Sequence, residues 1–370
     1  MHENKSLIAW MEEVPDPRIE KMVTYPLVEL LFTALIGVLC RMEEWDEIVY
    51  FAEENIEWLQ QFYPYENGVA SEKTLRLVFS RIDQKAFAAA FTGWAGQWSR
   101  GGIIAIDGKT LRGTGESGKA KSALHVLNAF AHDSGMVLGQ KPVDGKSNEI
   151  TAIPAFLESL AIDGAIVTID AMGTQKDIAA TIIKQKADYV LALKGNQTTL
   201  HDDVQRFFAD PAFTAEGQTH KTTDAGHGRI EERVCRATDN LDWLRDLHPE
   251  WTNLHSIAAI TATRINKKTT ETSTETRFYI SSLPSDPALI LHATRSHWSV
   301  ENKLHWVLDV TFREDLCRTR KDYAALNLAL VRKIVLNLLR QDSLRKMPLK
   351  RMRLKASLDP LYRASLINAS

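Results

Sequence analysis

Two short hydrophobic runs that each end in an aspartate constrain the fold of this chain most strongly. Residues 103–106 are followed by Asp107, and residues 165–169 are followed by Asp170. β-Branched residues dominate both runs, and each run is too short for a buried helix, so the pattern predicts two buried strands. If these strands are neighbours in one sheet, their ends bring the two carboxylates together at one edge.

Paired carboxylates at a sheet edge predict a cation site. Two close negative charges repel each other, and oxygen ligands select Mg²⁺ or Mn²⁺ rather than zinc. Each aspartate could instead only cap the turn that follows its strand, where short polar side chains are common. The two runs by themselves leave both interpretations open.

Composition argues against several classes of protein. The 370 residues are 44% hydrophobic, which is enough for the cores of two or three domains. Three widely separated cysteines lack the C-x-x-C spacing of a zinc site and do not suggest a disulfide framework. A signal-peptide pattern is absent, and the longest apolar run, residues 26–40, is too short for a membrane span. We therefore expect a cytoplasmic protein without membrane contact.

Two segments of opposite charge lie behind a net charge of −2. Residues 1–66 contain 14 acidic residues against four Lys and Arg, whereas residues 317–355 contain 12 Lys and Arg against two acidic residues. The basic segment suggests contact with a polyanion, and a solvated surface is the alternative.

The first part of the chain, residues 1–100, is predicted to form a helical N-terminal domain. A single amphipathic helix is expected over residues 45–62, and Ser71 and Asp83 stand in N-cap positions of two more. The helix after Ser71 carries Arg76 and other basic residues that could contact DNA, or it could simply pack through its apolar face.

A mixed α/β region follows, in which we expect a loop from Gly108 to residue 121 and a helix that Thr174 opens. The predicted order is strands at 103–107, 124–132 and 136–143, a helix to residue 160, strand 165–170, helix 174–186 and strand 189–193. This is the order of an RNase H-like mixed sheet, although other α/β sheets would also fit the apolar runs.

Further along, residues 216–283 predict a β insertion that is separate from the central sheet. Helices return at Asp286. The catalytic core would then comprise residues 101–215 and 284–340, followed by a basic C-terminal tail over residues 341–370.

Glu301 lies in the helical run that follows Asp286, and the segment around it completes a set of long motifs. They are IAIDGKTLRG around Asp107, VTIDAMGTQKDIA around Asp170, HWSVENKLHWVLDVTF around Glu301, KSNEITAIP at 146–154, DYVLALKGNQ at 188–197 and HGRIE at 227–231. Together the motifs resemble the H-repeat-associated insertion-sequence transposases, a subgroup of the DDE transposases. The resemblance extends over residues 16–320.

This resemblance implies an RNase H-like core in which Asp107, Asp170 and Glu301 are the catalytic and metal-binding acids. It also implies two divalent ions, Mg²⁺ or Mn²⁺, and a multimer on DNA that cleaves transposon ends and transfers them to target DNA. Two ions about 3.5–4 Å apart suit an in-line displacement at phosphorus. An inactive DNA-binding remnant is the alternative function. The rival third acids are Asp309, Glu314 and Asp315.

One signature of the related transposases is altered here. The signature has Tyr, Arg and Lys around the glutamate, where this chain has Thr294, His297 and Leu308. The spacing of His297, Glu301 and His305 lacks the H-E-x-x-H pattern of a helical zinc site, so we do not predict zinc.

The predicted DNA contacts come from several parts of the chain, and we expect a protein associated with the bacterial nucleoid. They are Lys109, Arg112, Lys194, Asn196, His227, Arg229, His297, Lys303, His305, Arg345, Lys346, Lys350 and Arg351.

Overall fold

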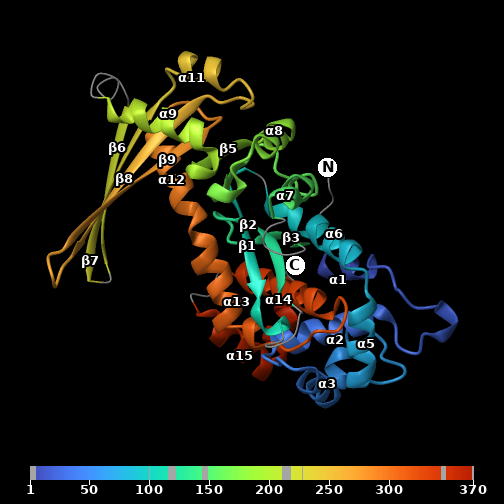
Figure 1. The fold of residues 1–370 in the computed structure, drawn as a ribbon. Coiled ribbons are helices and arrows are strands. Elements are labelled where there is room, and N and C mark those ends of the chain that lie inside the picture. The colour runs from blue at the N-terminus through green and yellow to red at the C-terminus, as the bar shows by residue number, and fades with distance from the viewer. Residues whose placement is uncertain are drawn as a thin grey trace. The chain divides into compact units, whose positions relative to one another are not determined.

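A computed structural model describes residues 6–99, 101–115, 122–143, 149–210, 218–226, 228–342 and 347–368 (Figure 1). The chain forms two compact units. The first comprises Met1–Trp98, Gly108–Asn148 and Glu301–Ser370, and the second comprises Ser99–Asp107 and Glu149–Val300. The N-terminal helices thus share a unit with the end of the chain.

The N-terminal helices of the first unit begin largely where the sequence predicts. Ser71 caps α5 by accepting from the Thr74 amide, and Asp83 caps α6 by accepting from the Ala86 amide. The prediction of a single helix over residues 45–62 was wrong, because the helix is interrupted at Asn55, between α3 and α4. The helices are α1 (Leu7–Glu12), α2 (Leu27–Leu39), α3 (Trp45–Glu54), α4 (Ile56–Leu59), α5 (Glu72–Arg81) and α6 (Gln84–Ala95).

The C-terminal part of the first unit centres on the buried helix α14 (Ala324–Gln341). Asn327 donates to the carbonyl oxygens of Phe79 and Ile82, and Asn337 bonds to both backbone polar groups of Val137. These bonds fix α14 against α5 and against the hairpin of β2 (Leu124–Ala131) and β3 (Val137–Val143). The other elements here are the π-helix η7 (Glu301–His305), α13 (Trp306–Val310), η8 (Glu314–Leu316), α15 (Leu349–Leu358) and α16 (Pro360–Asn368).

Strand β1 (Ile103–Leu111) is longer than predicted. We expected a loop from Gly108 onward, but the strand continues through Asp107 and Gly108. Lys109 and Leu111 are buried and Thr110 between them is exposed, which is the alternation of a strand. The prediction failed because Lys109 is a charged residue in a buried position.

Hydrogen-bonded strands follow the order β3-β2-β1-β4-β5-β9-β8-β7-β6. The first five strands have the RNase H-like order that the sequence predicts. The remaining strands correct our expectation of a separate insertion, because β9 pairs antiparallel with β5 and so extends the same sheet. Figure 1 shows β6, β7, β8 and β9, which we call the long strands, side by side. The strands are β4 (Ile166–Ile169), β5 (Asp188–Leu193), β6 (Gln218–Gly226), β7 (Arg229–Thr238), β8 (Ser256–Asn266) and β9 (Thr272–Ser281).

The helices of the second unit contain another correction. Thr174 does not open a helix; its hydroxyl donates to the Ala192 carbonyl, and α8 begins at Lys176. Helices α9 and α11 were not predicted from the sequence. The helices are α7 (Glu149–Leu157), α8 (Lys176–Lys184), α9 (Thr198–Ala209), α11 (Asp242–Leu247) and α12 (Pro287–His297). Across the described ranges, none of the helices combines the length and apolar character needed to cross a membrane.

The C-terminal region is helical, and Arg353 holds it within the first unit. Its guanidinium donates to the carbonyl oxygens of Val38 and Thr311 and pairs with Glu43 at 2.9 Å. The side chain is 1% exposed and stacks on the Phe312 ring. A buried charge of this kind needs all of its partners.

Replacement of Arg353 by Met should lower the free energy of unfolding by about 3–5 kcal/mol, because it removes the buried cation that pairs with Glu43 and donates to two backbone carbonyl groups. Urea unfolding of the whole chain measures this. Arg351→Met on the exposed side of α15 is the matched control and should stay within about 0.5 kcal/mol of wild type. Equal effects of the two substitutions would contradict the role given to Arg353.

Candidate active site

The candidate site begins with the parallel pairing of β1 and β4. Ile106 and Ile169 are register partners, so Asp107 and Asp170 directly follow aligned positions on neighbouring strands. Asp107 is half-buried and Asp170 is exposed. The predicted juxtaposition of the two strands is confirmed, and it brings both aspartates to one edge of the second unit's sheet.

Asp170 also caps the turn after its strand. One carboxylate oxygen accepts from the amides of Met172 and Gly173 at 3.1 and 3.2 Å, in the short 3-10 helix η5 (Ala171–Gly173). A side chain at Gly173 would place its Cβ 2.3 Å from the Ile169 side chain, so glycine is needed for this close turn. The cap orients the carboxylate and is compatible with the predicted role of Asp170 as a metal ligand.

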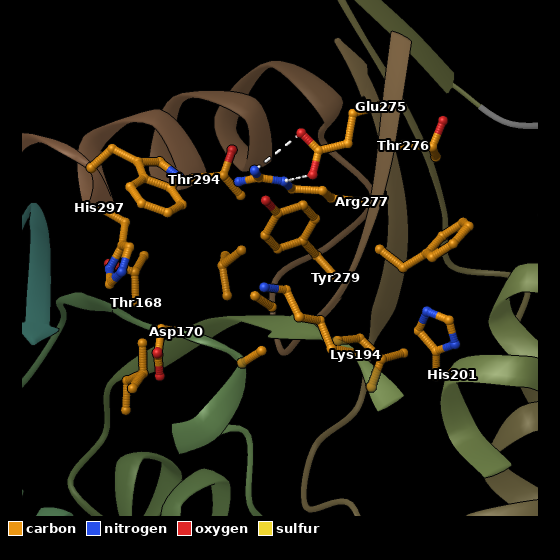
Figure 2. Close-up of a pocket in the computed structure, with 17 residues that line it drawn as sticks. Thr168, Asp170, Lys194, His201, Glu275, Thr276, Arg277, Tyr279, Thr294 and His297 are labelled. Carbon is orange, nitrogen blue, oxygen red and sulfur yellow. Dashed lines mark hydrogen bonds and ion pairs between the residues drawn. The ribbon is translucent and has the colours of Figure 1, made fainter. Parts of the chain in front are cut away.

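A cavity of about 210 Å³ opens beside Asp170, within the second unit (Figure 2). Lys194, which follows β5, lines this cavity together with Arg277 and Tyr279 from β9. Glu275 accepts two hydrogen bonds from Arg277 at 2.8 and 3.1 Å, and the guanidinium lies over the Trp298 ring at 5.4 Å. The lining of the cavity therefore contains two acids, Asp170 and Glu275, together with two cations and aromatic rings.

Part of this cavity was not predicted from the sequence. Arg277 stands in a strand that we assigned to a separate insertion, so no pattern in the sequence pointed to it. The pairing of β9 with β5 is what brings Arg277 to the site. Trp298, next to His297 in the motif, offered a signal because aromatic side chains often line ligand pockets.

His297 lines the same cavity but is only 8% exposed. Its Nδ1 lies 3.3 Å from the Thr168 hydroxyl. Burial lowers the pKa of His297, and this effect exceeds the opposing influence of the Asp170 charge and the Thr168 hydrogen bond. The imidazole is thus neutral near pH 7, and its contact with DNA stays a prediction.

Asn196, also predicted to contact DNA, has a bond inside the second unit. Its side-chain amide donates to the Ala171 carbonyl at 2.7 Å and so ties the segment after β5 to the turn after Asp170.

Glu301 is the first residue of the π-helix η7 in the first unit and is exposed. Such helices are rare and often occur at functional sites. Lys303 on the same helix is exposed, and its carbonyl accepts from Arg340, whereas His305 is half-buried. The convergence of Glu301 with the two aspartates stays a prediction.

The rival acids surround Lys109 in the first unit. Its ammonium lies 2.6 Å from Asp309, 3.4 Å from Asp315 and 3.9 Å from Glu314. Burial raises the pKa of Asp309, although Lys109 opposes the shift. These three acids form an ion cluster around a lysine that is 6% exposed, whereas Arg112, near Asp315, is 81% exposed.

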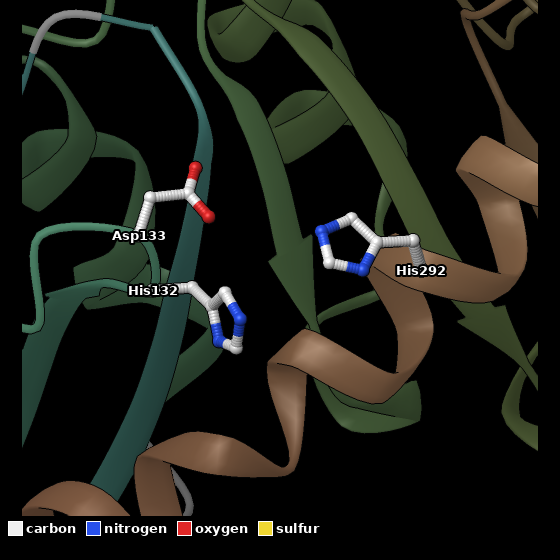
Figure 3. Close-up of side chains that lie close together, drawn as sticks. All are labelled: His132, Asp133 and His292. Atoms are coloured by element: carbon white, nitrogen blue, oxygen red, sulfur yellow. The ribbon is translucent and has the colours of Figure 1, made fainter.

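The other predicted contacts are dispersed. Arg229 is exposed at the start of β7, and Lys350 and Arg351 are exposed on α15. His227, Arg345 and Lys346 lie outside the described residues. Figure 3 draws His132 and Asp133, at the end of β2, with His292 on α12. Because His292 belongs to the second unit and the other two to the first, we assign no metal site to them.

Comparison with known families gives two matches, which together cover most of the chain. Residues 98–338 match the profile described as Transposase DDE domain, and residues 8–95 match the one described as DDE_Tnp_1-associated. The chain belongs to the DDE transposase family.

Its relatives include bacterial proteins of similar length. "Putative transposase YncI" of Escherichia coli O157:H7 is 39% identical over 97% of this chain and 93% of its own. "H repeat-associated putative transposase YhhI" of Escherichia coli K12 is 36% identical over 100% of this chain and 99% of its own. These relatives confirm the resemblance to the H-repeat-associated group. A solved piggyBac transposase complex with hairpin DNA has a TM-score of 0.44 and 13% identity over 98% of this chain and 77% of that chain.

Replacement of Lys109 by Met should destabilise the chain, because it leaves three neighbouring carboxylates without their cation. We expect a loss of about 3 kcal/mol, the low end for a broken buried ion pair, since Asp309 and Asp315 are partly exposed. Chemical denaturation provides the measurement. Arg112→Met removes the exposed neighbouring cation and should cost less than about 1 kcal/mol. Similar losses for both variants would argue against a buried cluster.

His297 should make stability depend on pH. Its folded pKa is below the unfolded value of about 6.5, so protonation favours the unfolded chain. Its contribution to stability is complete above about pH 6.5 and declines as the pH falls toward the folded pKa. In metal-free buffer, the stability of wild type relative to His297→Gln should decrease between pH 7.5 and pH 5. A constant difference across this range would show that His297 is not a buried neutral group.

Proposed function

We propose that this chain is an active transposase that cleaves the ends of an insertion sequence and joins them to target DNA. The observation that carries the proposal is the register of β1 and β4, which aligns Asp107 and Asp170 at one sheet edge beside a cavity that Lys194 lines. Family membership supports DNA as the substrate. We take Glu301 as the third acid.

The donor set fits the divalent metal that DDE transposases use. Asp107, Asp170 and Glu301 would hold Mg²⁺ or Mn²⁺, because all three offer the carboxylate oxygens that these hard ions prefer. Bound ions of this kind activate the attacking oxygen and stabilise the leaving oxygen at phosphorus. The cap on Asp170 supports this role, because two amide hydrogen bonds restrict the carboxylate to one orientation.

The two cations of the cavity, Lys194 and Arg277, would contact the substrate. Lys194 is a cation close to Asp170 in the lining and would hold a phosphate oxygen there. Arg277 is already paired with Glu275, so it is oriented before DNA arrives. A neutral His297 would serve as a packing residue or a hydrogen-bond partner rather than as a cation. This differs from the arginine that the related signature has at the same position.

The acids of the first unit differ in the partners that surround them. Asp309, Glu314 and Asp315 already surround Lys109, so the structure gives each of them a cationic partner. Glu301, on η7, is exposed and precedes all three in the sequence. This contrast is our reason for preferring Glu301 as the third acid.

Asp107→Asn, Asp170→Asn and Glu301→Gln should each reduce DNA cleavage more than about 100-fold, since even the loss of an outer partner of a metal ligand costs about 10- to 100-fold. The substrate is a linear duplex that carries the inverted repeats flanking the coding sequence, with Mg²⁺ or with a chelator. DNA binding of the variants should persist. Asp163→Asn, which changes an exposed acid of the second unit, is the control and should cut normally.

Three outcomes separate the alternatives. Cleavage by the Glu301 variant but not by an Asp309 variant would reassign the third acid. DNA binding by the wild type without any cutting would favour the inactive remnant. Cutting that survives both chelation and all three substitutions would disprove the metal-dependent mechanism.

A further inference from the structure

Gly228, which precedes β7, lies beside the turn that joins β8 to β9, at one end of the second unit's sheet (Figure 1). The Lys267 amide donates to the Gly228 carbonyl at 2.9 Å. The Asn266 side chain accepts from the amides of Lys268 and Thr269 at 2.9 and 3.3 Å. These bonds hold Gly228 and the turn between β8 and β9 together as one tip, which borders an open groove of about 700 Å³.

Positive charge predominates at this tip. Arg229 and Arg264 line the groove, with side chains that are 57% and 41% exposed. Lys268 also lines it and is exposed. Glu271 is the one acid among the lining residues, and its carboxylate accepts from the Thr269 hydroxyl at 2.9 Å. The groove therefore presents three cations against one carboxylate.

Behind the groove, a single buried carboxylate organises the arginines. Glu231 lies 2.7 Å from Arg233, 3.0 Å from Arg264 and 3.9 Å from Arg229. Burial acts to raise the pKa of Glu231, but the Arg264 hydrogen bond and the arginine charges hold it below its ordinary value. The ionised carboxylate orients three guanidinium groups while neutralising only one unit of charge.

Further acids pair with two of the three arginines, and this leaves Arg229 the least closely paired. Arg233 has a second acid, Asp224, at 2.9 Å, and Arg264 has Glu275 at 3.8 Å. The contact of Arg229 with Glu231 is the longest of the three, and Arg229 is also the more exposed of the two arginines in the groove. An arginine held in this way keeps its planar fork available to a bidentate acceptor such as a phosphate.

We propose that this groove, defined by Arg229, Arg264, Asn266, Lys268 and Thr272, binds the phosphodiester backbone of duplex DNA. Its lining side chains are polar or charged, which suits a phosphate backbone better than the apolar anchors of a peptide. The contact is independent of base sequence and involves a surface other than the cavity beside Asp170. This inference rests on the proposed function, because it takes DNA as the ligand.

The test compares two pairs of charge-neutralising substitutions in the full-length chain. Arg229→Gln with Lys268→Gln changes the groove, and Lys184→Gln with Arg206→Gln removes the same charge from exposed side chains elsewhere in the second unit. Affinity for a 40-bp duplex of arbitrary sequence, and for one carrying the inverted repeat, is measured over a range of KCl concentrations. Circular dichroism verifies that both variants fold.

The groove variant should show a shallower salt dependence of DNA binding. The slope of log affinity against log salt should fall by roughly two, because each of the two removed cations would neutralise about one phosphate. Its affinity for both duplexes should fall by roughly 10-fold or more at 0.1 M KCl. The control variant should behave like wild type.

Several results would overturn the proposal. They are an unchanged slope in the groove variant, an equal decrease in the control variant, or a loss confined to the inverted-repeat duplex. In each case, retained binding and Mg²⁺-dependent cleavage by wild type would leave the proposed function standing. Failure of the wild type to bind either duplex would instead remove both.

Discussion

The parallel pairing of β1 with β4 decides which side chains can meet at the candidate site. A shift of one residue in this register would turn every side chain of one strand to the opposite face of the sheet. With Ile106 opposite Ile169, both strands present their aspartates at the same level. The next strands continue the pattern: β5 is parallel to β4 and is followed by Lys194, and β9 returns antiparallel with Arg277. Strand order thus places groups of opposite charge around one cavity.

The first unit buries several charged side chains among its apolar residues. Lys333 is fully buried on α14 and donates to the Gln140 side chain at 2.5 Å. Burial lowers the pKa of Lys333 to about 8, against the opposing charge of Glu314. Arg353 and Arg363 are likewise buried, and each contacts the N-terminal helices. The hydrogen bonds of such groups depend on one packing arrangement, so they specify how the C-terminal helices pack against the N-terminal helices.

Carboxylates of the same chemical type have different roles in the two units, and their surroundings account for this. Around Lys109, acids close in sequence to Glu301 share a buried cation. At the tip of the long strands the ratio is reversed, since Glu231 is one acid among three arginines. Asp170 combines exposure, a fixed orientation and a neighbouring cavity. Local charge balance therefore distinguishes the structural ion pairs from the groups that we propose contact metal or DNA.

The sequence by itself determined the features that depend on neighbouring residues. β-Branched runs identified the strands that precede Asp107 and Asp170, Ser71 and Asp83 marked their helices, and the motifs identified the family. The tertiary structure alone decided that β1 continues past Gly108, that the long strands extend the central sheet, and that Lys109 pairs with Asp309, 200 residues away. Periodicity and capping report burial within one element, whereas an ion pair or a strand neighbour depends on which distant segment packs alongside. For that reason Lys109, which we expected in a loop, is buried in strand β1.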